Sequence, residues 1–575
     1  MSIPKVSGIE TEYAVVILGA NESDPLRAPR LIMNAYQNIG RNAVPCQPYI
    51  TYPSSDITSS FGVEGSRPAI KTMTSERVRP TIPSLERAAH DSRRASKTDM
   101  TDIMLANGAR FYIDHTHPEY STPECLSPRL LVAADKAGER ILAACQHWLN
   151  VTGGLPTGQS IRLYKNNSDY KGNSYGCHEN YLLSTELFND LLRRKPHLIF
   201  RYLFPFFISR TILCGSGKVG SENGTAHASF QLSQRADFFE TLIGLDTTHE
   251  RPLFNTRDEA HADPTRFRRL HVIIGDANMA EYSTYLKIGL TQLVLQMLED
   301  SFIKEDLTLA DPLDCMLTVS RDLTFQQPLT MEDGRSMTAL DIQYIYLDLA
   351  HNYLSARDGS QEQWNILKKW EEALDMLPDQ WELLSTRFDW AIKKRLLDRY
   401  LTTQGASWEE VTAWQPVIEE PDTLGTAKER AKRADLTWGD YERQRKLYFA
   451  LRRLDLEYHD VRYNPDLGET GLFYRLQQRE AIERLVTDEE IQERIALPSP
   501  DTRSWLRGQS IARFPDVLVS ADWSGMEFRL ADREVYLDLP DPLVNNEAET
   551  ASILDQKDNL SSIIRLQKVS GGDEP

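Results

Sequence analysis

Two short segments combine acidic, aromatic and basic side chains at a spacing of two residues. In GIETEYAVV, Glu10 and Glu12 lie on an expected strand, so both carboxylates leave the same face, about 6 to 7 Å apart along the chain. In ARFYIDHTHPEY the same spacing places Arg110, Tyr112 and Asp114 on one face of a second expected strand. Carboxylates this close repel each other. The sequence therefore predicts a cation or a basic partner here.

If the two segments are neighbours in one sheet, their oxygen ligands suit Mg²⁺, which prefers carboxylates, water and phosphates to softer ligands. Arg110 would then hold a phosphate group, and Glu119 and Glu124 add further carboxylates close by. The alternative is a plain strand whose carboxylates face water or pair with arginine. Periodicity alone does not decide between the two interpretations.

A different interpretation takes His115 and His117, which also share one face, as transition-metal ligands of a metallohydrolase. The chain contains no second HxH and no HExxH motif, so hydrogen-bonding roles are favoured for these imidazoles. Cys177 and His178 are adjacent and point to opposite faces of an expected strand, which argues against a cysteine nucleophile activated by that histidine. A packed thiol is expected instead.

Two later segments are rich in residues that bind ligands. LYKNNSDYKGNSYGCHENYL contains glycines and asparagines suited to tight turns, and it includes His178 near its end. NTRDEAHAD, followed by RFRRLHVIIGDANMAE, concentrates charge around Arg257 and His261 just before an expected strand. Such a density of charge is costly unless it binds something. The alternative for this second segment is a salt-bridged surface loop.

Composition excludes several classes of protein. The 575 residues include 65 Lys and Arg against 84 Asp and Glu, a net charge of −19, which repels the phosphate backbone of nucleic acids. The six cysteines show no CxxC spacing, which argues against a zinc site or a disulfide scaffold. No stretch resembles a signal peptide or a membrane span. We expect a cytoplasmic protein that binds neither nucleic acid nor membranes.

The pattern of apolar residues predicts an α+β fold. A stretch over 45–101 is rich in Ser, Thr, Pro and Arg and lacks an apolar stripe, so we expect a flexible polar insertion. The prolines around Ser499 mark a boundary, which divides the chain into a catalytic domain over 1–497 and a small C-terminal domain over 498–575 with a polar tail. Strands are expected over 6–18, 109–114, 161–164, 180–183 and 271–274, and helices over 29–40, 131–149 and 281–299.

Seven blocks in a fixed order resemble one known family. They are GIETEYA, NGARFYIDHTHPEYSTPEC, YKNNSDYKGNSYGCHENYL, FQLSQRADF, NTRDEAHAD, RRLHVIIGDANMAEYSTYLKIG and VSADWSGMEF. Together they resemble the family that holds the Pup ligase and the Pup deamidase/depupylase, Dop, over most of the chain. The resemblance implies a glutamine synthetase-like, curved and mostly antiparallel sheet flanked by helices, with a small C-terminal domain. It also implies the cofactors ATP, or ADP with phosphate, and Mg²⁺.

Carried over position by position, the resemblance assigns a role to each candidate residue. It implies that Asp114 is the catalytic carboxylate. It implies Mg²⁺ ligands at Glu10, Tyr112 and Glu119, nucleotide contacts at Arg110, Thr122 and Trp523, and a metal and phosphate site completed by His178 and His261 with Arg257 nearby.

The long insertion before the catalytic strand favours the depupylase branch, as do DHTHPEYS and GDANMAEYSTYLKIG, whereas CHENY and the ADW around Trp523 are closer to the ligase. The resemblance therefore implies hydrolysis of the side-chain amide of the C-terminal Gln of Pup, and of the Glu–Lys isopeptide bond of pupylated proteins. Its expected partners are Pup and pupylated proteins in the proteasome pathway. The alternatives are a Pup–protein ligase, which forms that bond with ATP hydrolysis, and a non-catalytic Pup-binding adaptor. The basic segment Lys428–Arg453 is either a Pup contact or an ordinary solvated helix face.

Overall fold

The structure is a computed structural model that describes residues 2–20, 25–39, 43–45, 101–152, 154–412, 428–429, 431–432, 436–531 and 533–555. The expected insertion lies outside these residues except for its two end positions, and so does the polar tail after residue 555.

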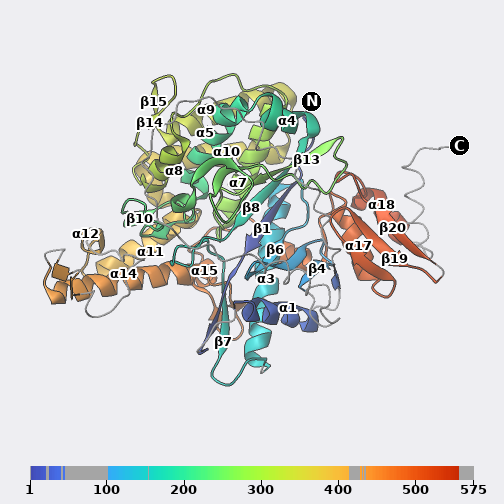
Figure 1. The fold of residues 1–575 in the computed structure, drawn as a ribbon, viewed down its shortest axis with the longest axis horizontal. Helices are drawn as coiled ribbons and strands as arrows, with labels where there is room; N and C mark the ends of the chain where they lie inside the picture. Colours follow the sequence, from blue (N-terminus) through green and yellow to red (C-terminus); the bar gives the residue numbers. More distant parts are fainter. Residues whose placement is uncertain are drawn as a thin grey trace, which may run out of the picture.

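A seven-stranded sheet lies at the centre of the molecule (Figure 1). Its order is β13-β8-β1-β6-β5-β4-β3, and every neighbouring pair is antiparallel. The first strand of the chain, β1, therefore lies between strands that come much later. The strands are β1 (Ser7–Glu12), β3 (Ala43–Pro45), β4 (Asp102–Leu105), β5 (Arg110–Asp114), β6 (His117–Ser121), β8 (Cys177–Ser184) and β13 (Phe267–Val272).

The sheet has an apolar face and an acidic face because side chains alternate along each strand. Ile9, Phe111 and Tyr120 are buried in the apolar layers, which lie toward helices α3 (Pro128–Val151) and α1 (Arg27–Ile39). Helix α3 begins where the Ser127 hydroxyl accepts a hydrogen bond from the Leu130 N–H and a proline occupies the first turn, a favourable helix start. The acidic side chains of β1, β5 and β6 are left on the opposite face.

A large helical layer packs on the β13 and β8 side of the sheet (Figure 1). Its central helix, α7 (Glu281–Glu299), is buried nearly all round, as expected for a core helix. The remaining helices between α3 and the C-terminal part of the chain are α4 (Thr185–Asn189), α5 (Phe204–Ser209), α6 (Thr211–Cys214), α8 (Pro312–Arg321), α9 (Ala339–Arg357), α10 (Gln361–Gln380), α11 (Asp389–Thr403), α12 (Trp408–Thr412), α14 (Trp438–Tyr458), α15 (Leu472–Gln478) and α16 (Asp488–Ala496).

The C-terminal unit, which we define as residues 504–554, has its own sheet and core at one side of the molecule (Figure 1). Its order is α17 (Ser504–Arg513), β18 (Leu518–Ala521), β19 (Gly525–Arg529), β20 (Glu534–Asp538) and α18 (Glu547–Leu554). Met104 of β4 joins the core of this unit, so the unit packs directly against the edge of the main sheet.

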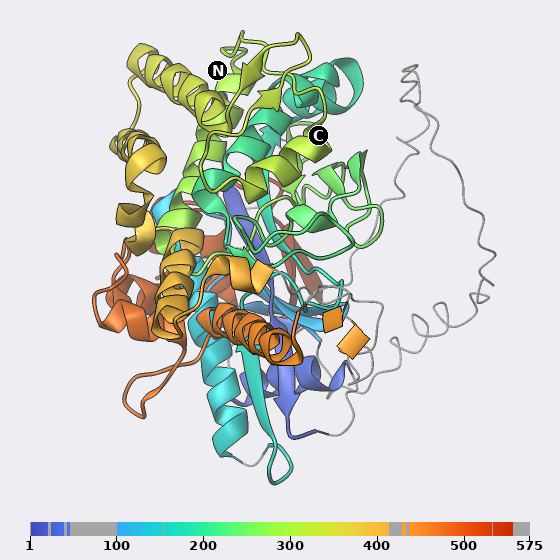
Figure 2. The same cartoon turned by 90° about the vertical axis from the view of Figure 1, so that its left-hand side faces the viewer.

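Short two-stranded sheets complete the fold. Strands β2 (Ala14–Leu18) and β7 (Ser160–Tyr164) pair with each other, and Figures 1 and 2 show β7 and the end of α3 at the same end of the molecule. The other pairs are β9 (Lys218–Val219) with β10 (Phe230–Gln231), β11 (Thr241–Gly244) with β12 (Pro252–Asn255), β14 (Leu329–Thr330) with β15 (Ser336–Met337), and β16 (Tyr463–Asn464) with β17 (Glu469–Thr470).

The expected α+β class is confirmed, with mostly antiparallel sheets. The predicted helices over 29–40, 131–149 and 281–299 are α1, α3 and α7. The strand expected over 6–18 is instead two strands, β1 and β2, because buried Tyr13 separates segments that pair with different neighbours. In the described part of the chain no single helix is long and apolar enough to cross a membrane, although one bent helix pair over 185–214 meets the length and composition criteria.

Candidate functional site

The register of the central sheet places acidic residues of separate segments in adjacent rows. Glu12 is opposite Glu119 of β6, and Glu119 is in turn opposite Tyr112 of β5. In the next row, Glu10 is opposite His178 of β8. Opposed residues on one face of a sheet lie about 4.5 to 5.5 Å apart, so the carboxylates converge.

Glu12, Asp114 and Glu119 form the first group, which we call the carboxylate cluster. Each offers an oxygen within 4.8 Å of the others. The Tyr112 hydroxyl donates a hydrogen bond to Glu119 Oε1 at 2.5 Å. Among the described residues, no lysine or arginine pairs with these three carboxylates; the ionic contacts are His117 with Glu12 at 3.3 Å and His115 with Asp114 at 3.0 Å.

This imbalance of charge shows in the protonation of the carboxylate cluster. Burial and the negative charges of Glu10, Glu12 and Asp114 raise the pKa of Glu119 well above its usual value. Burial also opposes ionisation of Glu12, but the hydrogen bond and charge of His117 hold the pKa of Glu12 at about 2. Ionisation of all three carboxyls of the cluster is therefore unfavourable as long as no cation is bound.

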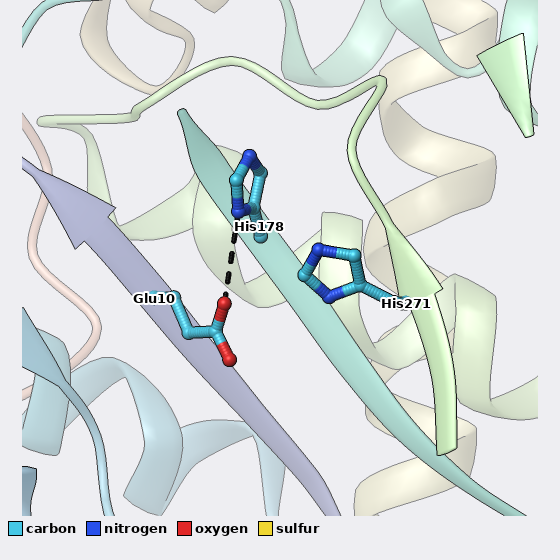
Figure 3. A group of neighbouring side chains, drawn as sticks. All are labelled: Glu10, His178 and His271. Atoms are coloured by element: carbon cyan, nitrogen blue, oxygen red, sulfur yellow. Dashed lines mark ion pairs between the residues drawn. The ribbon is translucent and has the colours of Figure 1, made fainter. Parts of the chain in front are cut away.

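Glu10, His178 and His271 form the second group, which we call the histidine cluster (Figure 3). His178 Nδ1 lies 3.6 Å from Glu10 Oε2. The side chain of Asn180 connects the cluster to Arg269, because its amide donates to Glu10 Oε1 at 3.0 Å and its oxygen accepts from Arg269 at 2.8 Å. Glu10 thus has one oxygen fixed by hydrogen bonds and one that faces the imidazoles.

His271 has the state of a metal ligand. Its Nδ1 lies 3.1 Å from Asn180 Oδ1, which favours a proton on Nδ1 and leaves the lone pair on Nε2. That Nε2 is buried and has no hydrogen-bond partner in the part of the chain that the structure describes. Burial and the charge of Arg269 lower the pKa of His271 well below its usual value, so the ring is neutral, the form that binds metals.

Gly176 provides space for His178. A Cβ at Gly176 would lie only 2.3 Å from His178 Nε2, so a side chain there would displace the imidazole. The next residue, Cys177, points to the other face and is buried, with its sulfur 3.8 Å from both the Thr11 hydroxyl and Lys287 Nζ. The expectation of a packed thiol is confirmed.

A cleft of about 620 Å³, open to solvent, adjoins the histidine cluster. Strands β1, β6 and β8 form one side of the cleft and the C-terminal unit contributes Trp523. Thr122 forms part of the floor, where its hydroxyl accepts a hydrogen bond from the Ile9 N–H at 3.0 Å. Burial and the nearby charges of Arg269, Arg503 and Arg110 lower the pKa of His261, another lining residue, to about 3, so its ring is neutral. The predicted residues that line the cleft are Glu10, Thr122, His261 and Trp523.

Two predicted nucleotide contacts lie outside the lining of this cleft. The Arg110 guanidinium donates to both oxygens of Asp102 at 2.9 and 2.7 Å and lies 4.3 Å from the centre of the Tyr112 ring. An acidic side chain of the neighbouring strand thus already pairs with this expected phosphate ligand. Arg257 is half-buried and its backbone N–H donates to Asn255 Oδ1 at 2.8 Å.

Sequence reasoning missed several residues of the site. Glu12 was recognised as the neighbour of Glu10 without being assigned a role, and His271 was recognised only as the start of a strand. The spacing of two between Arg269 and His271, equal to that between Glu10 and Glu12, was the available signal. Arg503, which also lines the cleft, gave no such signal because it belongs to a remote segment.

The chemistry of the two clusters fits divalent cations. Three carboxylates within 4.8 Å, one of them with a raised pKa, provide the hard oxygen ligands that suit Mg²⁺. The histidine cluster combines one carboxylate with two imidazoles, a set that transition-metal ions such as Mn²⁺ accept more readily than Mg²⁺ does. The residues present therefore fit the implied metal, and the unpartnered Nε2 of His271 strengthens this conclusion.

Fold and site together define a mixed α+β protein whose main antiparallel sheet presents two candidate metal-binding clusters beside an open cleft. The family model described as Pup-ligase protein matches residues 5–453 and 428–527, so the chain belongs to the Pup ligase and depupylase family.

Curated relatives include both branches of this family. The chain is 36% identical to a depupylase of Acidothermus cellulolyticus over 97% of this chain and 98% of that protein. It is 37% identical to a Pup deamidase/depupylase of Mycolicibacterium smegmatis over 82% of this chain and 84% of that protein. A Pup–protein ligase of Kineococcus radiotolerans is also 37% identical, over 72% of this chain and 80% of the ligase.

Solved structures of the ligase branch share the fold. The ligase PafA in complex with Pup gives a TM-score of 0.69 at 27% identity, over 99% of this chain and 93% of that chain. PafA in complex with ADP gives a TM-score of 0.64 at 29% identity, over 88% of this chain and 98% of that chain. The named relatives are enzymes of Pup chemistry, and members of the family bind Pup and an adenine nucleotide.

Proposed function

We propose that this protein is a Pup deamidase/depupylase. It hydrolyses the side-chain amide of the C-terminal Gln of Pup and the isopeptide bond that joins Pup to a lysine of a tagged protein. The observation that carries the proposal is the place of Asp114: its side chain is 40% exposed, yet it belongs to the carboxylate cluster. A depupylase that is similar over nearly the whole chain supports the hydrolytic branch.

Hydrolysis of an amide needs a nucleophile, stabilisation of the carbonyl oxygen and a proton for the leaving nitrogen. Asp114 fills the first role, either by attacking the carbonyl carbon itself or by taking a proton from water. In the water route, the hydroxide oxygen adds to the carbonyl carbon, the C–N bond breaks, and the proton passes to the departing nitrogen. The products are the Glu carboxyl group and ammonia or the free lysine amine.

Neighbouring side chains orient Asp114. His115 lies in the left-handed backbone region, with φ of 51°, and its Nδ1 is 3.0 Å from Asp114 Oδ2. This contact fixes one carboxylate oxygen and leaves Oδ1 without a partner among the described residues. Asp114 Oδ1 is therefore available for attack on the carbonyl carbon or for the proton of water.

The cofactors of the proposal are ATP, or ADP with phosphate, and Mg²⁺. Glu10, Tyr112, Glu119, His178 and His261 are the proposed metal ligands, and the geometry adds Glu12 and His271 to this set. When bound, metal and nucleotide would supply positive charge and ordered polar groups near the carbonyl oxygen. Arg110, Thr122, Arg257 and Trp523 are the proposed nucleotide contacts.

The proposal also covers the surroundings of the reaction. Pup and pupylated proteins are the partners, the proteasome pathway is the context, and the cytoplasm is the location. The proposal also includes a glutamine synthetase-like form of the sheet and a boundary at residue 498 between the catalytic domain and the C-terminal domain.

The second candidate is the Pup–protein ligase, which phosphorylates the Pup glutamate with ATP and joins it to a lysine amine. It is supported by the ligase of Kineococcus radiotolerans, which is as similar in identity as the depupylases. A non-catalytic Pup-binding adaptor is the third candidate, and the intact carboxylate cluster argues against it.

One experiment separates these candidates. The protein is incubated with ATP and Mg²⁺ and with Pup ending in Gln, with a Pup conjugate, or with Pup ending in Glu and a target protein. We expect release of ammonia from the first substrate and of free target protein from the second. Formation of a new conjugate with one ADP released per bond would establish the ligase instead, and Pup binding without turnover of any Pup derivative would establish the adaptor.

A further inference from the structure

A buried ion cluster connects the C-terminal unit to the main sheet. Glu124, which follows β6, accepts hydrogen bonds from Arg503 Nε at 3.0 Å and from Arg507 Nη1 at 3.1 Å. Its second oxygen accepts a further bond from Arg507 Nη2. The Arg507 side chain has no exposed surface, so Arg507 of helix α17 and Arg503, the residue that precedes this helix, contact one carboxylate away from water.

Arg507 also contacts the two segments that surround Glu124 in space. Its Nη1 donates to the backbone oxygen of Trp523 at 3.0 Å, and its Nη2 donates to the backbone oxygen of Gly108 at 3.0 Å. Gly108, with φ of +79°, lies in the turn between β4 and β5, where a Cβ would be 3.1 Å from the Pro498 ring. One guanidinium therefore joins the hairpin that carries Asp114 to the segment that carries Trp523.

The same guanidinium lies against the indole itself. Arg507 Cζ is 5.0 Å from the centre of the Trp523 ring, within the range of a cation–π contact. Trp523 is half-buried, and Thr122 and Arg503 line the same cleft. The backbone and the ring of Trp523 are thus both held from one side by Arg507.

The hydrogen bonds of Arg507 fix more of the geometry than is needed to attach the C-terminal unit to the main sheet. An apolar contact of the same size holds two units together without the desolvation of three charges. The planar guanidinium fixes direction as well as distance, because its donors point to fixed positions. The two arginines hold the pKa of Glu124 at about 2 against the effect of burial, so the cluster is ionised at every working pH.

We propose that Arg507, together with Glu124, is a positioning residue that sets the indole of Trp523 in the wall of the cleft for stacking against a nucleotide base. The inference rests on the proposed function, since it takes the cleft as the nucleotide site. The inference gives the C-terminal unit a role, because this unit supplies Trp523 to the wall of the cleft. The orientation of Trp523 depends on Arg507, which does not itself line the cleft.

A double-mutant cycle tests this role. The variants are Arg507→Lys, Trp523→Ala and the pair, and the measurement is the dissociation constant of ADP with Mg²⁺ by calorimetry. Loss of base stacking in Trp523→Ala weakens binding by about tenfold, and the misplaced indole of Arg507→Lys costs a similar factor. In the Trp523→Ala background, Arg507→Lys then has no further effect beyond twofold.

The control is Arg513→Lys on the same helix. Arg513 donates to the backbone oxygen of Leu554 and pairs with Asp555, and it does not line the cleft, so ADP binding stays unchanged. The kcat of Arg507→Lys at saturating nucleotide stays within about threefold of the parent protein, because a positioning residue of the base acts on binding. If Arg507→Lys does not fold, Glu124→Gln replaces it in the cycle.

Each possible result either supports or overturns the positioning role of Arg507. Additive effects in the pair would show a general structural role and overturn the proposal, and so would parent-like ADP binding by Arg507→Lys. Absence of ADP binding by the parent protein would overturn the proposed function as well. If the parent protein binds ADP but the two substitutions have additive effects, only the positioning role is overturned.

Discussion

Two groups of carboxylates lie on opposite sides of the central sheet, and they differ in how their charge is balanced. On the side of α3, Lys165 Nζ donates to Asp135 at 2.6 Å and to Glu139 at 2.9 Å, and Lys136 donates to Glu139 at 2.9 Å. Two carboxylates there contact two ammonium groups. In the carboxylate cluster on the other face, the described residues provide imidazoles but no ammonium or guanidinium partner.

The difference appears in the protonation of two equally buried glutamates. Burial opposes ionisation of Glu139, but Lys136 and Lys165 hold its pKa at about 2. Burial and three neighbouring carboxylates raise the pKa of Glu119 well above its usual value. A balanced group stays ionised without a ligand, whereas an unbalanced one either binds a proton or takes up a cation. The comparison therefore separates a structural ion cluster from a candidate metal site.

The largest expected effect concerns Asp114, the proposed nucleophile or base. Asp114→Asn keeps the size of the side chain but removes the nucleophile or base, so we expect turnover to fall by roughly 10² to 10⁴-fold. Nucleotide binding, measured by calorimetry, stays unchanged. Asp333→Asn is the control, because Asp333 is an exposed carboxylate in the turn between β14 and β15 that pairs with Arg335. Unimpaired cleavage by Asp114→Asn would refute the assignment.

The second prediction compares how substitutions on the two faces of the central sheet change the stability of the protein. Lys165→Met leaves two buried carboxylates short of a partner and is expected to lower the free energy of unfolding by about 3 to 5 kcal/mol. Glu119→Gln, in metal-free protein, keeps the hydrogen bond from Tyr112 and removes repulsion, so no loss of stability is expected. Urea unfolding in the presence of EDTA measures both. Equal destabilisation by the two substitutions would contradict the distinction between balanced and unbalanced groups.

The third prediction concerns the choice of metal. His271→Ala removes an imidazole from the histidine cluster and is expected to weaken Mn²⁺ binding by about 10 to 100-fold. Mg²⁺ binding at the carboxylate cluster changes less, because that cluster offers oxygen ligands only and does not include His271. Electron paramagnetic resonance of bound Mn²⁺ provides the measurement, with exposed His249→Ala as the control. Loss of Mg²⁺ and Mn²⁺ affinity to the same extent would show that the two clusters do not differ in preference.

The smallest effect is the pH dependence of the metal-free protein. Because the pKa of Glu119 is raised on folding, the folded state binds more protons than the unfolded state above the usual pKa of glutamate. Stability from this group is complete at low pH and decreases as pH rises toward the folded pKa, by at most about 1.4 kcal/mol per pH unit. Glu119→Gln should reduce this slope.

Mg²⁺ binding should release a proton from Glu119, detectable by calorimetry in two buffers of different ionisation enthalpy. Absence of proton release would contradict the raised pKa of Glu119.

The sequence predicted which residues share a strand face better than it predicted contacts between remote segments. A spacing of two residues identified Glu10 with Glu12, and Arg110 with Asp114, as occupants of single strand faces, and β1 and β5 bear this out. Apolar periodicity likewise located α3 and α7. Local patterns determine these features, so they can be read from neighbouring letters.

Register and remote pairing could not be read in this way. Arg110 was expected to be available for phosphate, but the pairing of β4 with β5 places Asp102 beside it. His271 joins Glu10 and His178 only through the order β13-β8-β1. The contact of Glu124 with Arg507 spans 383 positions. Such contacts depend on which strands become neighbours, and that information is spread over the whole chain.

The central position of β1 has a consequence for synthesis of the protein. This strand is made before its partners β6 and β8, and long before Trp523. Until β8 is complete at Ser184, about a third of the way along the 575 residues, β1 has an open edge and its two glutamates lack their neighbours, a state that is exposed to aggregation. A polypeptide cut short before residue 523 would contain every acidic ligand of the sheet and still lack a wall of its cleft.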